Sequence, residues 1–187
     1  MANFTSKAIK TSFLKLLNEK PMSKISVRDI VEDCGINRNS FYYHFQDILT
    51  LLEEIITDEI NDIIAQYPEI NSLEDCFNAA YSFALDNKKA ILHIYNSVNR
   101  DIFERELMKL CDYVVVTYTR TAFPQSKMKK DDLVILQRFL KCELFGILID
   151  WMNDGMKDEA INGLLRITEL CRGFLLQLAE RSINNND

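Results

Sequence analysis

Apolar residues recur three and four positions apart along most of the chain, a spacing that places them on one face of an α-helix. Glycine and proline, which interrupt helices, number only 5 and 3 among 187 residues. The pattern therefore predicts an all-α protein of about nine helices. Their expected ranges are 6–18, 26–34, 37–45, 48–66, 72–86, 88–99, 101–123, 131–153 and 158–183.

Short polar residues and a glycine mark the helix ends in the first fifty positions. Ser26, followed three residues later by Asp29, matches a capping box that opens the second helix. Gly35 suits the left-handed backbone that commonly ends a helix. Asn37 and Asp47 are expected to cap the third and fourth helices. The second and third helices are therefore short and closely spaced.

Two short helices separated by residues 34–37 predict a helix-turn-helix, whose second helix enters the major groove of DNA. On that second helix, Phe41 and Phe45 share the side that packs on the other two helices. An alternative is that the remaining aromatic residues also belong to the core. We favour DNA contact, because Phe41 and Phe45 already occupy the core positions and further aromatic side chains on so short a helix cannot all face inward.

The polar side chains of this helix suit DNA recognition. Arg38 can donate two hydrogen bonds to guanine, and Asn39 can pair with adenine. Tyrosine and histidine can reach phosphate oxygens, and a neutral cap at a helix N-terminus favours a nearby phosphate. The residues predicted to contact DNA from this helix are Asn37, Arg38, Asn39, Ser40, Tyr42, Tyr43 and His44.

Charge is distributed unevenly between residues 1–50 and 51–187, which we expect to be a DNA-binding domain and a larger helical effector-binding and dimerisation domain. The first range has 7 Lys/Arg and 5 Asp/Glu, a charge of +2; the second has 15 and 23, a charge of −8; the sum is −6. A weakly basic head can approach DNA while an acidic body is repelled. A difference of this size also arises by ordinary scatter.

Several other classes of protein are disfavoured. The chain has no glycine-rich phosphate loop, no metal-spaced Cys/His set and no nucleophile motif, so we expect no enzyme, cofactor or metal site. No signal peptide or membrane span of about 18 apolar residues is present, and we expect a cytoplasmic protein. The five scattered cysteines are typical of reduced thiols. A thiol sensor that uses Cys76, Cys111, Cys142 or Cys171 is disfavoured, because no basic cluster adjoins these residues in the sequence.

The helix expected at 131–153 is apolar on nearly all sides. From Leu133 to Met152 it has 14 apolar residues and four charged ones. A body of this size cannot easily cover such a helix alone, so we expect a homodimer formed by the last two helices. An ordinary monomer core is the alternative.

The stretch from Lys7 to Leu52 resembles the TetR/AcrR family of bacterial regulators. The resemblance lies in residues 25–31, in the turn 34–38 and in residues 40–45. Trp151, Gly155 and Met156 are similar to a turn that precedes the last helix in many relatives. One position departs from the family, because many relatives have a phosphate-contacting lysine where this chain has Ile48.

The resemblance implies a homodimer that binds a double-stranded operator of twofold symmetry and is released by a small-molecule effector. It implies base contacts for Arg38, Asn39 and Ser40, backbone contacts for Tyr42, Tyr43 and His44, and a phosphate contact for Arg28. The candidate effector-pocket residues are Phe77, Tyr81, His93, Tyr95, Phe103, Tyr113, Tyr118 and Phe139, each of which is otherwise a core residue. The effector is unknown. The default sign of action is repression; an activator, or a regulator that acts through protein partners with a weakened DNA head, is the alternative.

Overall fold

Helices account for all regular structure in the part of the chain that the computed structural model describes, namely residues 2–70, 81–82, 84–122, 128–157, 163, 166–167, 170 and 173–184. This confirms the all-α prediction. The elements are α1 (Ala2–Glu19), the 3₁₀ turn η1 (Met22–Lys24), α2 (Val27–Cys34), α3 (Arg38–His44), α4 (Ile48–Gln66), α6 (Lys88–Tyr95), α7 (Arg100–Ala122), α8 (Lys130–Asn153) and α10 (Phe174–Asn184).

The predicted caps set the ends of the first helices. Ser26 and Asp29 form a complete capping box, in which the Ser26 hydroxyl accepts from the Asp29 backbone N–H and the Asp29 carboxylate accepts from the Ser26 N–H. Gly35 ends α2 with φ of +69°. The side chain of Asn37 accepts from the Ser40 N–H at 2.8 Å at the start of α3. These interactions satisfy backbone groups that have no partner inside the helix.

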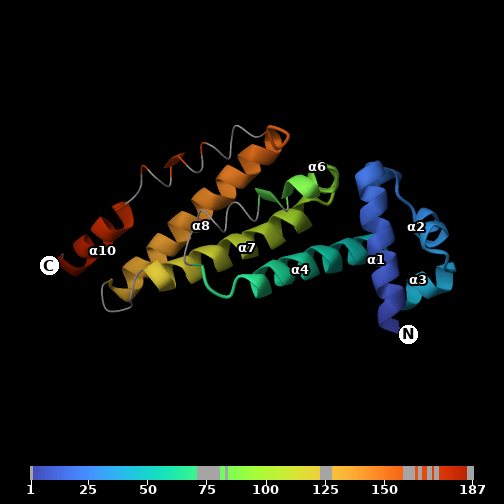
Figure 1. Ribbon diagram of the computed structural model, residues 1–187, viewed down its shortest axis with the longest axis horizontal. Helices are drawn as coiled ribbons and strands as arrows, with labels where there is room; N and C mark the ends of the chain where they lie inside the picture. The colour runs from blue at the N-terminus through green and yellow to red at the C-terminus, as the bar shows by residue number, and fades with distance from the viewer. Residues whose placement is uncertain are drawn as a thin grey trace. The chain divides into compact units, whose positions relative to one another are not determined.

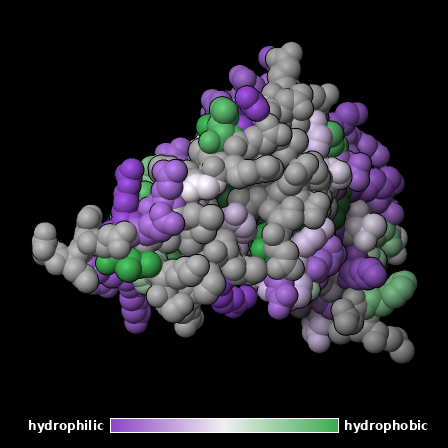
Figure 2. Space-filling view, turned by 60° about the vertical axis from the view of Figure 1, so that its left-hand side comes forward, coloured by the Kyte–Doolittle hydropathy of each residue, from purple (hydrophilic) through white to green (hydrophobic). Residues whose placement is uncertain are grey.

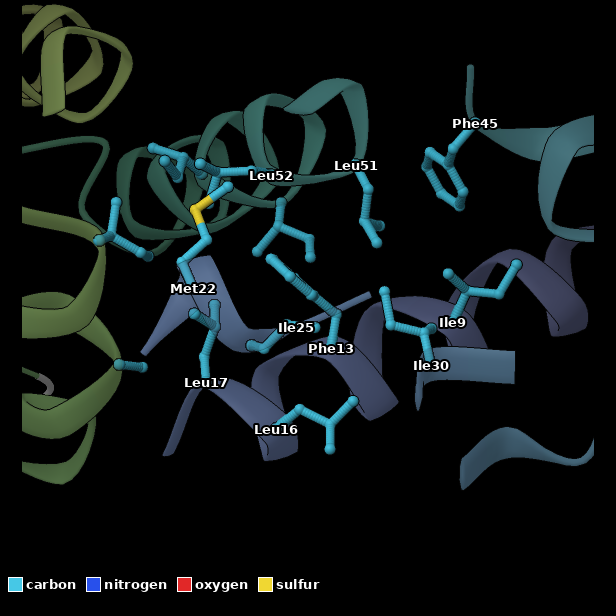
Figure 3. Packing of buried hydrophobic residues seen from close by; sticks show 14 of the residues in the cluster. Ile9, Phe13, Leu16, Leu17, Met22, Ile25, Ile30, Phe45, Leu51 and Leu52 are labelled. Atoms are coloured by element: carbon cyan, nitrogen blue, oxygen red, sulfur yellow. The ribbon is translucent and has the colours of Figure 1, made fainter. Parts of the chain in front are cut away.

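The core of the head joins α1, α2, α3 and the first half of α4. Figure 3 shows side chains from these elements pointing toward one another. Ile9, Phe13 and Leu17 of α1 are fully buried, as are Leu51 and Leu52 of α4. Burial of each such side chain contributes about 1.5–3 kcal/mol to folding. The apolar face predicted for the first helix is therefore the face that holds the head together.

Two compact units divide the chain. The first comprises residues 1–62 and 86–106, and the second comprises residues 63–85 and 107–187. The head predicted for residues 1–50 lies within the first unit, together with α6. In this unit α2 and α3 pack on one side of α1 (Figure 1), and α6 also contacts α1. Ala90 and Ile94 of α6 are buried in the same core as the head residues.

In the second unit the part of α7 from Leu107 onward lies beside α8 (Figure 1). The Gln137 side chain of α8 donates to the Thr119 hydroxyl of α7 at 2.9 Å, and Lys141 pairs with Asp112 at 2.9 Å. Tyr113 of α7 donates to the carbonyl of Tyr67 at 2.8 Å, which fixes the chain that follows α4. The core of this unit is formed by Ile70, Cys111, Val114, Val115 and Leu144.

The turn after α8 contains two consecutive residues with left-handed backbone, Gly155 with φ of +74° and Met156 with φ of +56°. The Met156 N–H donates to the Trp151 carbonyl at 2.8 Å, and the Trp151 indole donates to the Lys157 carbonyl at 2.9 Å. Met156 is fully buried. Burial and hydrogen bonds thus hold a non-glycine residue in a conformation that is otherwise disfavoured.

Two helix predictions were wrong. The helix expected at 88–99 ends at Tyr95, because Asn96 bonds back to the Leu92 carbonyl and the Ser97 hydroxyl accepts from the Asn99 N–H. The single helix expected at 158–183 is interrupted at Gly173, whose φ of +84° is left-handed, and α10 begins after it. Outside the described residues lie 158–162, 164–165, 168–169 and 171–172 of that prediction, and 72–80 and 83 of the helix expected at 72–86.

Among the residues coloured in Figure 2, the hydrophobic ones form small groups with hydrophilic ones near them. None of the described helices is long and apolar enough to cross a membrane.

Candidate nucleic-acid interface

Helix α3 presents one aromatic side to the core and another to solvent. Phe41 and Phe45 are 0% and 2% exposed and lie in the head core, as the sequence predicts. Tyr42 and Tyr43 are 56% and 79% exposed. Exposure of this degree is unusual for two adjacent aromatic residues in a small domain, and it leaves both hydroxyls free to approach a partner.

Two kinds of polar side chain lie at the start of α3: those that cap the helix and those that are exposed to solvent. The Asn37 side-chain oxygen accepts from both the backbone N–H and the hydroxyl of Ser40. These two side chains therefore fix the start of the helix. Arg38 and Asn39 are exposed, and no residue in the described ranges forms an ion pair with Arg38. The guanidinium and the amide at this end can thus reach a ligand without breaking an existing contact.

His44 at the end of α3 is half-buried. Its ring lies edge-on to Tyr43 with centroids 5.1 Å apart, and tilted against Phe45 at 6.3 Å. Aromatic contacts of this geometry restrict the side chains involved. The Tyr43 ring is therefore held at its base by His44 while most of its surface stays exposed.

Arg28 lies near the start of α2, exposed to solvent. Its guanidinium pairs with Glu32 one turn later at 2.6 Å, and the hydrogen bond to Glu32 raises the pKa of Arg28. An exposed i,i+4 pair contributes only a few tenths of a kcal/mol, so Arg28 can exchange Glu32 for a phosphate at low cost.

The start of α4 differs from the rest of this surface. The Asp47 side chain caps α4 by accepting from the Thr50 N–H at 2.7 Å, and this hydrogen bond lowers the pKa of the Asp47 carboxyl. Ile48 is half-buried and packs against the head core. Ile48, at the position where many relatives have lysine, therefore packs against the core. Its neighbour Asp47, the N-cap of α4, is negatively charged.

Three lysines on α1 or just after it are engaged within the head. Lys10 pairs with Asp58 at 2.6 Å, Lys15 with Asp33 at 2.5 Å and Lys20 with Asp29 at 3.1 Å. Pairs between helices cannot be recognised from sequence spacing, and sequence reasoning missed them. Their charges are therefore paired with carboxylates of the head, whereas Arg38 forms no ion pair with any of the described residues.

The candidate effector residues lie in different places. His93, Tyr95 and Phe103 belong to the first unit, where Tyr95 is 2% exposed and its ring lies 6.4 Å from that of Phe103. His93 Nδ1 lies 2.6 Å from the Leu17 carbonyl oxygen. The Arg100 guanidinium stacks over the Tyr95 ring at 3.9 Å. The structure brings these residues against the head.

The remaining candidates are in or near the second unit's core. Tyr81 is half-buried and lies 5.6 Å from Trp151, ring to ring. Tyr113 is half-buried with its hydroxyl bonded to backbone, Tyr118 packs beside the core, and Phe139 is 54% exposed on α8. Phe77 lies outside the described residues. Within the ranges that are described, no group of three or more potential ligands could hold a metal ion.

Comparisons with known proteins agree with this architecture. The family model for bacterial regulatory proteins of the tetR family matches residues 14–55. A second model, described as a transcriptional regulator C-terminal region, matches residues 71–173, more than half of the chain. No curated protein matches.

Among solved structures, one described as the dihydroxyacetone kinase operon activator DhaS is similar to this chain. The two share 19% sequence identity, with 89% of this chain and 97% of that chain covered and a TM-score of 0.69. At this identity the likeness shows a common fold. A head with the tetR-type helix-turn-helix and a regulator-type helical body together identify the chain as a member of the TetR family of transcriptional regulators.

Proposed function

We propose that the protein binds an operator of twofold symmetry as a homodimer, with α3 in the major groove, and that it acts as an effector-released repressor. The observation that carries the proposal is the two-sided packing of α3. Phe41 and Phe45 fasten the helix to the head, while Arg38, Asn39 and the two tyrosines project outward. These are the side chains that pair with base edges and phosphates.

On this proposal each exposed group has a defined part. Arg38 and Asn39 contact bases, with the Ser40 hydroxyl oxygen still able to accept a hydrogen bond. Tyr42, Tyr43 and His44 contact the DNA backbone, as does Arg28 after leaving Glu32. Asn37 contributes mainly as the cap that places the α3 N-terminus toward a phosphate.

The homodimer is supported by an apolar stripe on α8. Ile135 is 66% exposed and Phe139 54%, and Cys142 and Gly146 follow on the same helical face at spacings of three and four residues. A β-carbon added at Gly146 would meet no atom within 4 Å. An exposed apolar helix face of this kind is typical of a subunit interface. We therefore place the dimer contact on α8, with Ile167 and Leu170, which are 45% and 63% exposed, extending it.

We further propose that an effector binds in the helical body, which contains the Tyr81–Trp151 ring pair and Tyr113. Aromatic side chains with a few polar groups are a common lining of small-molecule sites. On this proposal binding favours a head spacing that does not fit the operator. The scattered reduced cysteines suit action in the cytoplasm.

Activation is the second candidate, because the similar solved structure is that of a protein described as an operon activator. The sign of regulation depends on where the operator lies relative to a promoter, which the fold does not fix. A related alternative is a regulator whose head binds DNA weakly because of Ile48 and which acts through protein partners.

The test is selection of DNA by the purified protein. The protein is incubated with a random pool of duplexes at low salt, and the retained sequences are read and footprinted. We expect a twofold-symmetric site whose half-sites are spaced by about 10 base pairs or a multiple of that. Retention of no duplex above the non-specific level would contradict the proposal. Reporter expression from the selected site with and without the protein then separates repression from activation.

A further inference from the structure

The last turn of α1 contains a carbonyl group that has lost its usual partner. In an α-helix the carbonyl of residue 17 accepts from the N–H of residue 21. Here residue 21 is proline, which has no N–H. Leu17 is fully buried, so water cannot readily replace the missing donor. A buried carbonyl without a donor is unfavourable, and the chain must supply one from elsewhere.

His93 of α6 supplies this donor. Its Nδ1 atom lies 2.6 Å from the Leu17 carbonyl oxygen, across 76 residues of sequence. Because a carbonyl only accepts hydrogen bonds, Nδ1 must bear the hydrogen. The bond thus joins α6 to the carbonyl end of α1 at one defined point.

Packing around this point is incomplete on one side. A cavity of about 700 Å³ is lined by His93, by Met22 of η1, by the α3–α4 turn at Asp47 and by Asn99 in the α6–α7 turn. A long side-chain hydrogen bond, from the Asn99 amide to the Met22 sulfur at 3.8 Å, also joins two of these segments. Beside this cavity, the short hydrogen bond of His93 therefore adds a polar contact between α6 and α1 to the apolar packing of Ala90 and Ile94.

We propose that His93 is a positioning residue for the DNA-binding head, acting as a cap, supplied by α6, for the α1 carbonyl that Pro21 leaves open. Helices α2 and α3 both pack on α1. The position of the α1 carbonyl end relative to α6 therefore sets where α3 is held. This inference rests on the proposed function. It concerns how the head is held, since His93 does not lie on α3 and need not touch DNA.

The test compares full-length variants on the duplex that the wild-type protein selects from a random pool. His93→Leu keeps bulk but removes the donor, and His93→Asn keeps an N–H close to the position of Nδ1. Lys89→Ala, an exposed change on the same helix, is the matched control. We expect His93→Leu to weaken binding about tenfold, the equivalent of one lost buried hydrogen bond, and His93→Asn to restore most of it.

The dependence of affinity on salt separates positioning from contact. Because the number of phosphates neutralised is unchanged, we expect the slope of log affinity against log salt to be the same in all variants. Wild-type affinity in His93→Leu, or equal weakness of His93→Leu and His93→Asn, would overturn the inference. A lower slope in His93→Leu would assign His93 to DNA contact and overturn it as well.

Amide hydrogen exchange gives a readout that needs no DNA. His93→Leu should speed exchange at the amides of Lys20, Lys24 and Ile25, which bond to carbonyls in the last turn of α1 and at residues 21 and 22. It should leave unchanged the amide of Phe45, which follows α3 and bonds to the Phe41 carbonyl. Unchanged exchange at the first three amides would contradict the inference. If the wild-type protein selects no duplex, the proposed function fails. The exchange pattern then still decides whether the His93–Leu17 hydrogen bond holds α6 to the end of α1.

If His93→Leu does not fold, exchange in His93→Asn decides the question. Protection as in the wild type supports a role for this hydrogen bond, and faster exchange at those three amides contradicts it.

Discussion

The Nζ atom of Lys10 on α1 lies 2.6 Å from Oδ2 of Asp58 on α4, 48 residues further along the chain. The same Nζ atom lies 2.6 Å from Glu54, one turn earlier on α4. Burial on its own would lower the pKa of Lys10, but the hydrogen bonds to Asp58 and Glu54 raise it above the ordinary lysine value. The Lys10 ammonium group thus pairs with both carboxylates of α4, which offsets their mutual repulsion, and it links α4 to α1.

Replacement of Lys10 with methionine should destabilise the head modestly. The change leaves Glu54 and Asp58 as unpaired like charges at i,i+4, and we expect a loss of about 0.5–1 kcal/mol in the free energy of unfolding. Urea unfolding at neutral pH and low salt measures it. Lys7→Met, at an exposed position on the same helix, is the control and should change stability less. Equal losses in the two variants would refute a specific role for Lys10.

Pro21→Ala should make the His93 hydrogen bond partly redundant. Alanine restores an N–H four residues after Leu17, in register with the bond from the Lys20 N–H to the Leu16 carbonyl. The loss of proline's rigidity in the unfolded chain costs about 0.4–1 kcal/mol, which the new hydrogen bond offsets. We therefore expect Pro21→Ala alone to be nearly neutral.

A double-mutant cycle with urea unfolding measures this coupling. His93→Leu should cost less in the Pro21→Ala background than in the wild type, by about 0.5–1.5 kcal/mol. Additive effects would show that residue 21 and His93 do not serve the same carbonyl.

Arg38→Ala and Tyr42→Ala should weaken DNA binding in different ways. Loss of a guanidinium paired with a guanine costs about 1–3 kcal/mol and relaxes preference at one base pair. Loss of the Tyr42 hydroxyl from the backbone weakens binding to all sequences alike. Affinities for the selected duplex and its single-base variants distinguish the two. Arg120→Ala, an exposed arginine on α7, should bind as the wild type. Unchanged sequence preference in Arg38→Ala would remove Arg38 from base recognition.

Phe139→Glu should disrupt the proposed homodimer. In one subunit Phe139 is 54% exposed, so a charge there is tolerated by the fold but not by an apolar interface. We expect the variant to sediment as a folded monomer and to bind the operator at least tenfold more weakly, since two heads no longer bind together. Val98→Glu is the matched control, because Val98 is 97% exposed and lies off the α8 stripe. A Phe139→Glu dimer as stable as the wild type would place the interface elsewhere.

Acid should destabilise the head through three carboxylates. Hydrogen bonds from Ser26 hold the pKa of Asp29 far below its usual range, a hydrogen bond from Lys15 lowers that of Asp33, and the Thr50 backbone lowers that of Asp47. Each pKa is lower in the folded than in the unfolded chain. Their contribution to stability is therefore present above about pH 4 and is lost as the pH falls further.

Urea unfolding as a function of pH checks this prediction. The free energy of unfolding should change little from neutral pH to about pH 5 and then fall. Asp29→Asn should reduce the steepness of the fall. A decline of equal steepness in Asp29→Asn would show that Asp29 is not one of the groups responsible.

Local chemistry made the head predictable from the sequence. The capping box of Ser26 and Asp29, the left-handed Gly35 and the Asn37 cap all act within four residues, so their sequence spacing is sufficient to identify them. The burial of Phe41 and Phe45 followed from helical periodicity in the same way. The helices expected to continue through Asn96 and Gly173 were predicted wrongly. The apolar spacing typical of a helix continues past these residues, but the helical backbone conformation ends at them.

The sequence by itself determined the helices, their caps in the head and the side of α3 that is buried, because these depend on interactions between near neighbours. Only the tertiary structure decided which distant groups meet. Pro21 has no N–H, so the sequence indicates that the Leu17 carbonyl has no hydrogen-bond donor within the helix. Nothing in the sequence spacing identifies His93 as the donor that replaces it. Likewise, the sequence alone leaves Lys10 available for DNA contact. In the structure, α1 and α4 pack together so that Lys10 forms ion pairs with Glu54 and Asp58 instead. Contacts of this kind depend on how helices pack together, a property that local periodicity does not encode.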